Sequence, residues 1–188
     1  MTVFLETERL VLRWFTGDDL DLVIELDGDA EVMRYINNGQ PVDLAEVAEI
    51  LDWWLTHYDS DGGYGFWAAI EKATDRFLGW FHFRPGEGAG PHEPELGYRL
   101  RRDAWGQGYA TEGSRALIDK GFTELGVERV YAESMAVNIG SRRVMENAGL
   151  RYVRTFAAEW PVRIPGDEEG DVEYAITRAE WEADRAAG

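Results

Sequence analysis

The clearest pattern of hydrophobic and polar positions lies in residues 95–125, ELGYRLRRDAWGQGYATEGSRALIDKGFTEL. In residues 95–100, apolar side chains alternate with charged residues and a glycine, which predicts a strand. Gly106 and Gly108 interrupt this alternation, and apolar residues then recur at helical spacing through residues 109–125. The stretch therefore predicts a strand, a glycine-rich turn and a helix that begins directly after the turn.

Such a turn is a natural site for a phosphate or a diphosphate. The first N–H groups of a helix have no intrahelical partner and carry partial positive charge, and glycines let the backbone approach a ligand closely. Two well-known phosphate motifs are not completed, because no Gly-Lys-Ser/Thr follows and Thr111 replaces the third glycine of a dinucleotide fingerprint. An ordinary strand-to-helix turn remains the alternative, so the spacing alone leaves the question open.

The rest of the chain has a mixed α/β pattern, with no linker or internal repeat, and predicts one domain over residues 1–188. Further strands are predicted at residues 9–15, 64–71, 77–84, 129–134, 150–157 and 172–176, and further helices after Thr16, at residues 30–35, 43–57 and 138–147, and around Trp181. Because a helix joins them, strands 95–100 and 129–134 should run parallel.

Composition narrows the classes of function. The chain has no cysteine, and 19 basic against 36 acidic residues give a formal charge of -17, which argues against a nucleic-acid or membrane partner. We see no signal peptide and no apolar run near the roughly 18 to 20 residues that span a bilayer, so a cytoplasmic protein is expected. Local clusters of arginine at positions 99, 101, 102, 115, 142 and 143 suit a phosphorylated cofactor, while the acidic remainder suits a cationic substrate.

Four segments in this order resemble the GNAT superfamily of acyl-CoA-dependent N-acetyltransferases, and within it the branch of ribosomal-protein N-terminal (alanine/serine) acetyltransferases. They are LETERLVLRWFTGDDLDLVIEL (5–26), ELGYRLRRDAWGQGYATEG (95–113), NIGSRRVMENAGLRYV (138–153) and DVEYAITRAEW (171–181). The resemblance covers nearly the full length. It implies a GNAT-like fold, in which a central mixed sheet flanked by helices is splayed between two parallel strands, 95–100 and 129–134, with acetyl-CoA in the gap.

The resemblance also implies the residues that bind acetyl-CoA. They are Tyr98, Arg99, Leu100, Arg101, Arg102, Trp105, Gly106, Gln107, Gly108, Tyr109, Ala110, Thr111, Asn138, Ser141 and Arg142. Trp105 departs from the superfamily's broader preference for Arg or Gln at its position, although aromatic residues are usual there in this branch. Because tryptophan adds no charge, Arg101, Arg102 or Arg142 should supply it.

Transfer of an acetyl group to an amine needs an acid for the departing thiolate and stabilisation of the carbonyl oxygen. Backbone N–H groups of the central strand in residues 98–100 are the candidates for the second task, and the lack of cysteine favours direct transfer. Met145 stands where many members of the superfamily have a tyrosine acid, so Ser141, which lies near the cofactor sulfur in the branch, is assigned as the acid. The alternative is that Ser141 only caps the helix that begins near Asn138.

The base that deprotonates the amine is expected to be Glu95, with Glu133 second, Glu159 third and water as a further option. Glu95 shares a strand face with Gly97, whose missing side chain leaves room for substrate. For each carboxylate the alternative is a solvated group at a strand end. His82 is expected to be a packed core histidine, with a place in the acceptor pocket as its alternative, and no pair of histidines has the spacing of a metal site.

The sequence therefore predicts an N-acetyltransferase that moves the acetyl group of acetyl-CoA to a primary amine, either a peptide N-terminus or a small molecule, without a metal. A catalytically idle acyl-CoA-binding or regulatory module is the alternative, and a nucleotide-binding domain is a weaker one. The loops expected to form the acceptor pocket are residues 28–42, 57–65, 85–94 and 157–171, whose conformation the sequence leaves open. The oligomeric state is also left open, with a homodimer as one option, since dimers are common among the proteins that this chain resembles.

Overall fold

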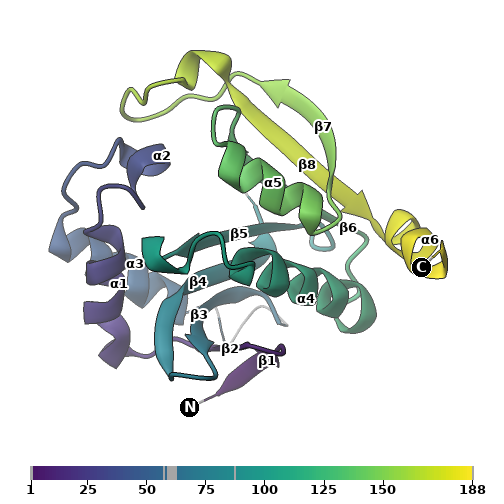
Figure 1. Cartoon of the computed structure of the whole chain (residues 1–188), viewed down its shortest axis with the longest axis horizontal. Helices are drawn as coiled ribbons and strands as arrows, with labels where there is room; N and C mark the ends of the chain where they lie inside the picture. The colour runs from purple at the N-terminus through teal and green to yellow at the C-terminus, as the bar shows by residue number, and fades with distance from the viewer. Residues whose placement is uncertain (1, 57, 59–62, 87, 188) are drawn as a thin grey trace.

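The computed structural model describes every residue except 1, 57, 59–62, 87 and 188 (Figure 1). The described residues form one mixed sheet of eight strands in the order β1-β2-β3-β4-β5-β6-β8-β7. The strands are β1 (Val3–Glu6), β2 (Leu10–Trp14), β3 (Gly65–Glu71), β4 (Arg76–Pro85), β5 (Pro94–Leu100), β6 (Arg129–Met135), β7 (Arg151–Phe156) and β8 (Asp171–Thr177). The helices are α1 (Leu20–Asp27), α2 (Arg34–Asn37), α3 (Leu44–Leu55), α4 (Tyr109–Glu124), α5 (Ile139–Asn147) and α6 (Arg178–Ala187), with short 3-10 turns η1 (Gly17–Asp19), η2 (Arg102–Ala104) and η3 (Asp167–Glu169).

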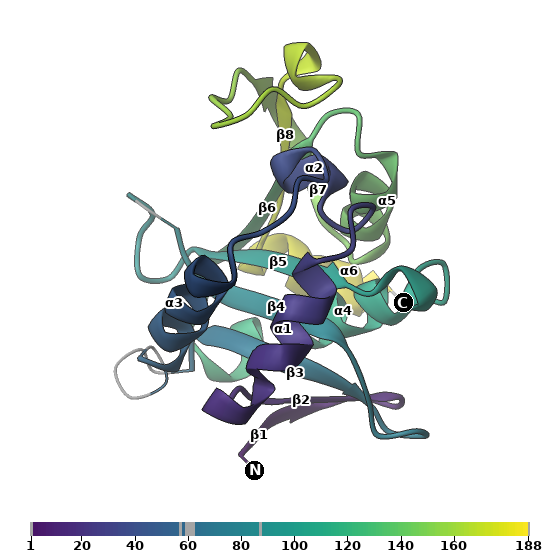
Figure 2. The same cartoon turned by 90° about the vertical axis from the view of Figure 1, so that its left-hand side faces the viewer.

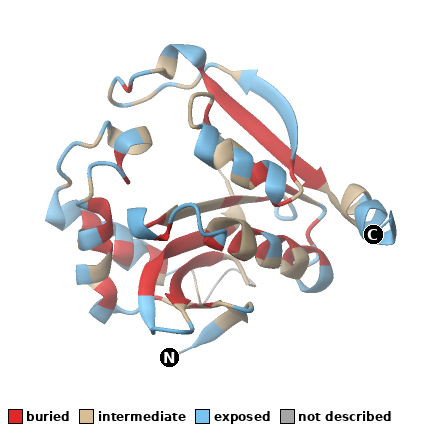
Figure 3. Cartoon of the chain, viewed as in Figure 1, coloured by how far each residue is buried: buried red, intermediate tan, exposed pale blue. Residues whose placement is uncertain are grey.

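Two hydrophobic cores lie on the two faces of the sheet, as the alternation along β3 requires. Trp67 and Ala69 belong to the core under α4, whereas Phe66 and Ala68 belong to the core under α1 and α3. Figure 2 shows α1 and α3 on the near face of β2 to β5 and α4 on the far face, and in Figure 3 the buried segments follow the strands between these layers. This packing fixes β4 and β5 from both sides.

The sheet opens between its two central parallel strands. The strands β5 and β6 share one registered pair, Glu95 with Tyr131, whereas β5 pairs with β4 along its whole length and β6 does the same with β8. The backbone of β5 beyond that pair therefore has no neighbouring strand on one side. This confirms the mixed sheet splayed between strands 95–100 and 129–134.

Several local predictions are confirmed. Asp19 accepts a hydrogen bond from Thr16 N–H at 2.8 Å in a capping box, and Glu180 forms the same box with Thr177. Asp43 caps α3 by accepting from Ala45 N–H at 2.8 Å. Sequence signals at helix starts were thus reliable in this chain.

Other local predictions are wrong. The edge strand β1 was missed because its four residues are too short for a periodic signal, and it pairs antiparallel with β2. The helical piece expected at residues 30–35 is α2, which begins at Arg34, since the side chain and carbonyl of Asp29 instead hold the preceding segment in a turn. The helix expected to continue to residue 57 ends at Leu55, and residue 57 lies outside the described residues.

Among the helices that the structure describes, none is long and apolar enough to cross a membrane. That the chain forms one domain over residues 1–188 stays a prediction.

Candidate active site

A cavity of about 920 Å³ lies where β5 and β6 diverge. Its walls come from β5, the turn before α4, β6, α5 and, on the opposite side, residues around α2. It brings together most of the predicted site residues, namely Glu95, Tyr98, Arg99, Leu100, Trp105, Gly106, Gly108, Tyr109, Ala110, Thr111, Glu133, Asn138 and Ser141. The predicted residues Arg101, Arg102, Gln107 and Arg142 do not line it, and neither does the third-choice base Glu159.

The unpaired edge of β5 presents backbone N–H groups to this cavity. Arg101 N–H donates to Leu78 of β4 at 2.8 Å. Because the backbone groups of a strand alternate between its two sides, those of Arg99 also face β4 and those of Tyr98 and Leu100 face the gap. The carbonyl of Leu100 accepts from the Trp105 indole N–H at 2.8 Å. Tyr98 and Leu100 N–H are thus available to a ligand carbonyl.

The turn before α4 offers a second set of backbone donors. Gly106 and Gly108 have φ of 71° and 84°, a conformation that glycine adopts without strain. The first bond inside α4 runs from Glu112 N–H to the Gly108 carbonyl at 2.9 Å. Within the described residues, no backbone acceptor is found for the N–H groups of residues 106–111. This turn therefore fits a diphosphate at the start of α4, which carries partial positive charge.

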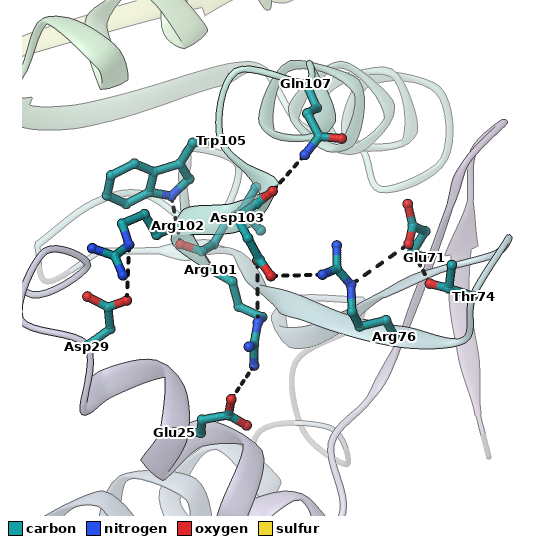
Figure 4. Close-up of polar contacts among 11 residues, drawn as sticks. Glu25, Asp29, Glu71, Thr74, Arg76, Arg101, Arg102, Asp103, Trp105 and Gln107 are labelled. Atoms are coloured by element: carbon teal, nitrogen blue, oxygen red, sulfur yellow. Dashed lines mark hydrogen bonds and ion pairs between the residues drawn. The ribbon is translucent and has the colours of Figure 1, made fainter.

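The arginines expected to add charge there have other partners. Arg101 and Arg102 extend away from the turn toward Glu25 and Asp29, as Figure 4 shows. Arg142 donates to the Tyr174 hydroxyl and to the Ala136 carbonyl.

On α5 the arginine that lines the cavity is Arg143, which is exposed and was not assigned to the cofactor site from the sequence. Nothing in the spacing distinguished it from Arg142. The two residues are adjacent on one helix turn. Which of the two side chains faces the cavity depends on how α5 is oriented in the fold.

The candidate acid lies beside a second hydroxyl. Asn138 is the cap of α5, because its Oδ1 accepts from Ser141 N–H at 3.2 Å, so the alternative role of Ser141 as the helix cap is wrong. The Ser141 side chain instead lies close to the Tyr98 hydroxyl, and burial raises the pKa of Tyr98 to about 12. Two hydroxyls, both protonated at neutral pH, therefore face the cavity near the buried Met145.

The two leading candidate bases both line the cavity. Burial, with the nearby negative charge of Glu133, raises the pKa of Glu95. Burial also raises the pKa of Glu133, with a further contribution from Glu173. The side chain of Glu95 is only 28% exposed, so the alternative of a solvated group does not describe it. Glu133 and Glu159, by contrast, are exposed.

His82 occupies the space that Gly97 was expected to leave for substrate. The two residues are register partners on β4 and β5, and a Cβ on Gly97 would lie 2.4 Å from His82 Nε2. The imidazole packs against Phe66 and Trp80, as expected of a packed histidine, and it also lines the cavity. Its place in the acceptor pocket stays a prediction. Burial lowers the pKa of His82 to about 3, with help from the positive charges of Arg84 and Arg99.

Three nitrogen atoms at this end of the cavity are buried without a partner. Trp80 Nε1, His82 Nε2 and Arg99 Nε have no hydrogen-bond acceptor in the described part of the chain. All three residues line the cavity and share one face of β4 and β5, where Trp80 is the register partner of Arg99. A buried donor without a partner is unfavourable by about 1–3 kcal/mol, so a ligand oxygen here gains by meeting them.

No group of three or more His, Cys, Asp or Glu residues is arranged to hold a metal ion in the described ranges. The donors and hydroxyls above make a site for an acyl ligand and an amine.

Comparisons with known proteins agree with this geometry. The sequence model of the acetyltransferase (GNAT) domain matches residues 9–151. A curated relative, the FsC-acetyl coenzyme A-N(2)-transacetylase of Aspergillus fumigatus, is 36% identical over 94% of this chain and 77% of its own length.

Solved structures share the fold. An acetyltransferase (GNAT family) from Bacillus anthracis superposes with a TM-score of 0.76 at 26% identity, over 93% of this chain and 98% of that one. The spermidine N-acetyltransferase of Vibrio cholerae, in complex with CoA and spermine, has a TM-score of 0.74 at 15% identity, over 94% and 99%. At that identity the second likeness is one of fold alone.

Proposed function

Since this chain belongs to the GNAT acetyltransferase family and is an acetyl-CoA-dependent N-acetyltransferase, we propose that its acceptor is an α-amino group next to a carbonyl or carboxylate oxygen. The observation that carries the proposal is the set of unpartnered nitrogens on Trp80, His82 and Arg99 beside the candidate base Glu95. The same acceptor class covers free or esterified amino acids and peptide N-termini.

Three chain segments would hold acetyl-CoA. The N–H groups of residues 106–111 would bind the diphosphate, with Arg143 as the nearby cation, and the β5 edge would pair with the amides of the pantetheine arm. Asn138 and Ser141 on α5 would flank the opposite side. Of the predicted cofactor residues, Arg101, Arg102 and Arg142 would act only indirectly, because they lie outside the cavity lining, and Gln107 would contribute its backbone N–H alone.

When bound, acetyl-CoA supplies a thioester whose carbonyl carbon accepts an unprotonated amine. Tyr98 and Leu100 N–H would donate to the carbonyl oxygen as its negative charge grows. Glu95, or Glu133 in its place, would take the proton of the incoming ammonium group, a role that its raised pKa favours. Ser141, backed by the Tyr98 hydroxyl, would give a proton to the sulfur as the carbon–sulfur bond breaks, and would regain one from the acceptor nitrogen, which must lose a second proton to become the amide. The transfer is then direct, without a covalent enzyme intermediate.

Two observations support an α-amino acceptor. The indole of Trp80 offers an N–H group, neutral His82 offers another in the tautomer protonated at Nε2, and Arg99 offers a cation. They lie beside Glu95 and would meet the carbonyl or carboxylate oxygen, which is three bonds from the amine nitrogen. The name of the A. fumigatus relative specifies N(2), and in an amino acid N(2) is the nitrogen on carbon 2, the α-amino nitrogen. We include in this proposal that the chain belongs to the ribosomal-protein N-terminal branch, because the four sequence segments resemble it. The acceptors of that branch are also α-amino groups.

Association into a homodimer also remains a prediction. The edge strand β7 exposes Tyr152 and Val153, and the molar mass in solution tests it.

The test uses matched pairs of amines that differ in one group. L-tyrosinamide with tyramine and L-lysinamide with cadaverine compare an α-amine beside a carbonyl with the same amine without it. Because the chain has no cysteine, a thiol reagent reports only the released CoA, and the mass gain of one acetyl group identifies the product.

We expect kcat/KM to be at least about tenfold higher for each amide, the discrimination typical of one buried hydrogen-bonding group. Trp80→Phe, which keeps the ring and removes the N–H, should lower kcat/KM for the amides and leave the plain amines unchanged. Equal rates within each pair would refute the acceptor class and leave the acetyltransferase assignment intact.

A further inference from the structure

Three ion pairs join the end of β5 and the following turn to the end of α1. Arg99 Nη1 lies 2.6 Å from Asp27 Oδ1, and Arg101 Nη1 lies 2.8 Å from Glu25 Oε1. The third pair joins Arg102 Nε to Asp29 Oδ2 at 3.6 Å. In Figure 4, Arg101 and Arg102 both reach across to the α1 segment. We call this set of three pairs the arginine ladder.

The acidic residues of the ladder are followed directly in the chain by a segment that lines the cavity. We call residues 31–36 the acceptor wall, because Glu31, Val32, Arg34, Tyr35 and Ile36 line the cavity opposite α5. Asp29 holds this segment in two ways: its Oδ1 accepts from Glu31 N–H at 2.9 Å, and its carbonyl accepts from Met33 N–H at 3.0 Å. A shift of Asp29 therefore moves the acceptor wall.

The basic side of the ladder leads directly into the cofactor turn. Ala104 N–H donates to the Arg101 carbonyl at 3.0 Å, and Trp105 N–H donates to the Arg102 carbonyl at 3.2 Å. These bonds close the 3-10 turn η2, and the unpartnered N–H groups of residues 106–111 follow at once. The two arginines are thus fixed to the backbone that receives the diphosphate.

The acids on α1 lie at the C-terminal end of the helix, where a cationic partner stabilises them. Asp27 is the last residue of α1 and Glu25 lies in its last turn, where the partial negative charge of a helix end disfavours a carboxylate. Asp27 is also 6% exposed. A buried carboxylate at a helix C-terminus is tolerated when a cation neutralises it, which Arg99 does.

We propose that Arg101 and Arg102 are positioning residues for the acceptor, which act through the arginine ladder on the acceptor wall and couple amine binding to cofactor binding. This inference rests on the proposed function, since it assigns residues 31–36 to the acceptor side of the cavity. It replaces the role that the sequence gave to these two arginines, that of adding charge to the cofactor phosphates.

Coupling of this kind is reciprocal. If the cofactor holds η2 in the geometry that the ladder requires, it stabilises the acceptor wall and tightens binding of the amine, and the amine then tightens binding of acetyl-CoA by the same factor. The same acids and arginines in swapped positions would keep the coupling, whereas two like charges would abolish it.

The experiment reverses charges in the pair of Arg101 and Glu25, in which Arg101 Nε also lies 3.5 Å from Asp103 Oδ1. Arg101→Glu and Glu25→Arg each place like charges together, and the double variant restores an opposite pair. Asp21→Arg is the matched control, because Asp21 is exposed on the same helix and, among the described residues, no ion pair involves it. The Kd of acetyl-CoA is measured by calorimetry, and KM is measured for the amide that turns over fastest in the panel above, at saturating acetyl-CoA.

Both single variants should raise KM for the amide about fivefold, near the lower end of typical coupling, and leave the acetyl-CoA Kd of the amine-free enzyme within about twofold. The double variant should restore KM, and Asp21→Arg should leave it unchanged. A loss of acetyl-CoA affinity confined to Arg101→Glu would overturn the proposal in favour of a phosphate contact. So would a fall in Tm with KM unchanged, since that is the result of a purely structural pair.

Hydrogen–deuterium exchange separates this inference from the choice of acceptor. With CoA alone as the ligand, exchange at residues 28–37 should slow in the wild type, the control and the double variant, and stay fast in the two single variants. If no amide turns over, the proposed acceptor class fails while the exchange result still decides the coupling. An unchanged exchange rate in the wild type would overturn it.

Discussion

Replacing His82 by phenylalanine should make the protein less sensitive to acid. The imidazole is 14% exposed and lies between Phe66 and Trp80. Its Nε2 has no hydrogen-bond partner in the part of the chain described. Phenylalanine fills a similar volume and leaves no unsatisfied nitrogen, so His82→Phe should cost little stability near neutral pH.

The size of the effect follows from the pKa. Burial lowers the pKa of His82 from 6.5 to about 3. Between these values the unfolded chain binds a proton at His82 that the folded chain does not, so the free energy of unfolding falls as the pH decreases. When the pH falls from about 8 to about 5.5, His82 alone should lower the free energy of unfolding by about 1.4 kcal/mol, at 1.36 kcal/mol for each pKa unit.

The direction of the pKa shift of His82 depends on which neighbouring charge has the larger effect. Glu95 Oε1 lies 3.9 Å from His82 Nε2, and an ion pair there would raise the pKa instead. At that distance no hydrogen bond forms, and the positive charges of Arg84 and Arg99 oppose protonation of the ring. We therefore expect the neutral ring to persist well below pH 6.

The assay is urea unfolding of the wild type, His82→Phe and the control His92→Phe at the two pH values. His92 is exposed, so its variant should lose as much stability as the wild type. His82→Phe should lose about 1.4 kcal/mol less, while groups common to all three proteins cancel. Equal losses in all three would refute a neutral, buried His82, and a larger loss in His82→Phe would point to an ion pair with Glu95.

Three further outcomes test the catalytic assignments. Ser141→Ala should lower kcat, and adding Tyr98→Phe should bring the loss to about 100-fold with little change in the affinity for CoA, because both hydroxyls act on the leaving sulfur; a double variant as active as the wild type would contradict this. Glu95→Gln should lower kcat/KM by about 100-fold and remove the acid limb of its pH profile, which in the wild type rises through a pKa above the usual value for glutamate; an unchanged profile would move the base to another group. Arg143→Ala should raise KM for acetyl-CoA about tenfold, as expected for one charge-assisted contact, whereas Arg142→Ala, whose side chain binds Tyr174 and Ala136, should leave it within about twofold.

The parts of the site that the sequence predicted are those set by local backbone chemistry. Gly106 and Gly108 mark the turn because few other residues adopt their φ, and the free N–H groups after them follow from the start of a helix. The alternation in residues 95–100 likewise gave the face of Glu95, whereas the free edge of β5 was implied only by the resemblance to the GNAT superfamily. Each of these features depends on residues a few positions apart.

The errors concern contacts between segments far apart in the chain. Arg101 was assigned to the cofactor because its partner Glu25 lies 76 positions away, and no local pattern indicates that meeting. In the same way, the room above Gly97 belongs to His82 only because of the register between β4 and β5. Tertiary packing decides which partner a charged side chain meets and which side chain fills the space above a glycine. A sequence pattern therefore cannot show whether such a charge or space is free for a ligand.

The point where β5 and β6 diverge accounts for both the proposed base and the proposed donors to the thioester carbonyl. The single registered pair between β5 and β6 contains Glu95 itself, opposite Tyr131. On one side of that pair the strands diverge and free the N–H groups of Tyr98 and Leu100; at the pair, Glu95 is packed closely enough to be desolvated and to lie in the field of Glu133.

A sheet closed along its full length would satisfy the N–H groups, and one open along its full length would solvate the carboxylate. The proposed base and the proposed carbonyl site therefore depend on where the strands part. Substitutions that move this point, such as a larger residue at Gly97, should impair both functions together.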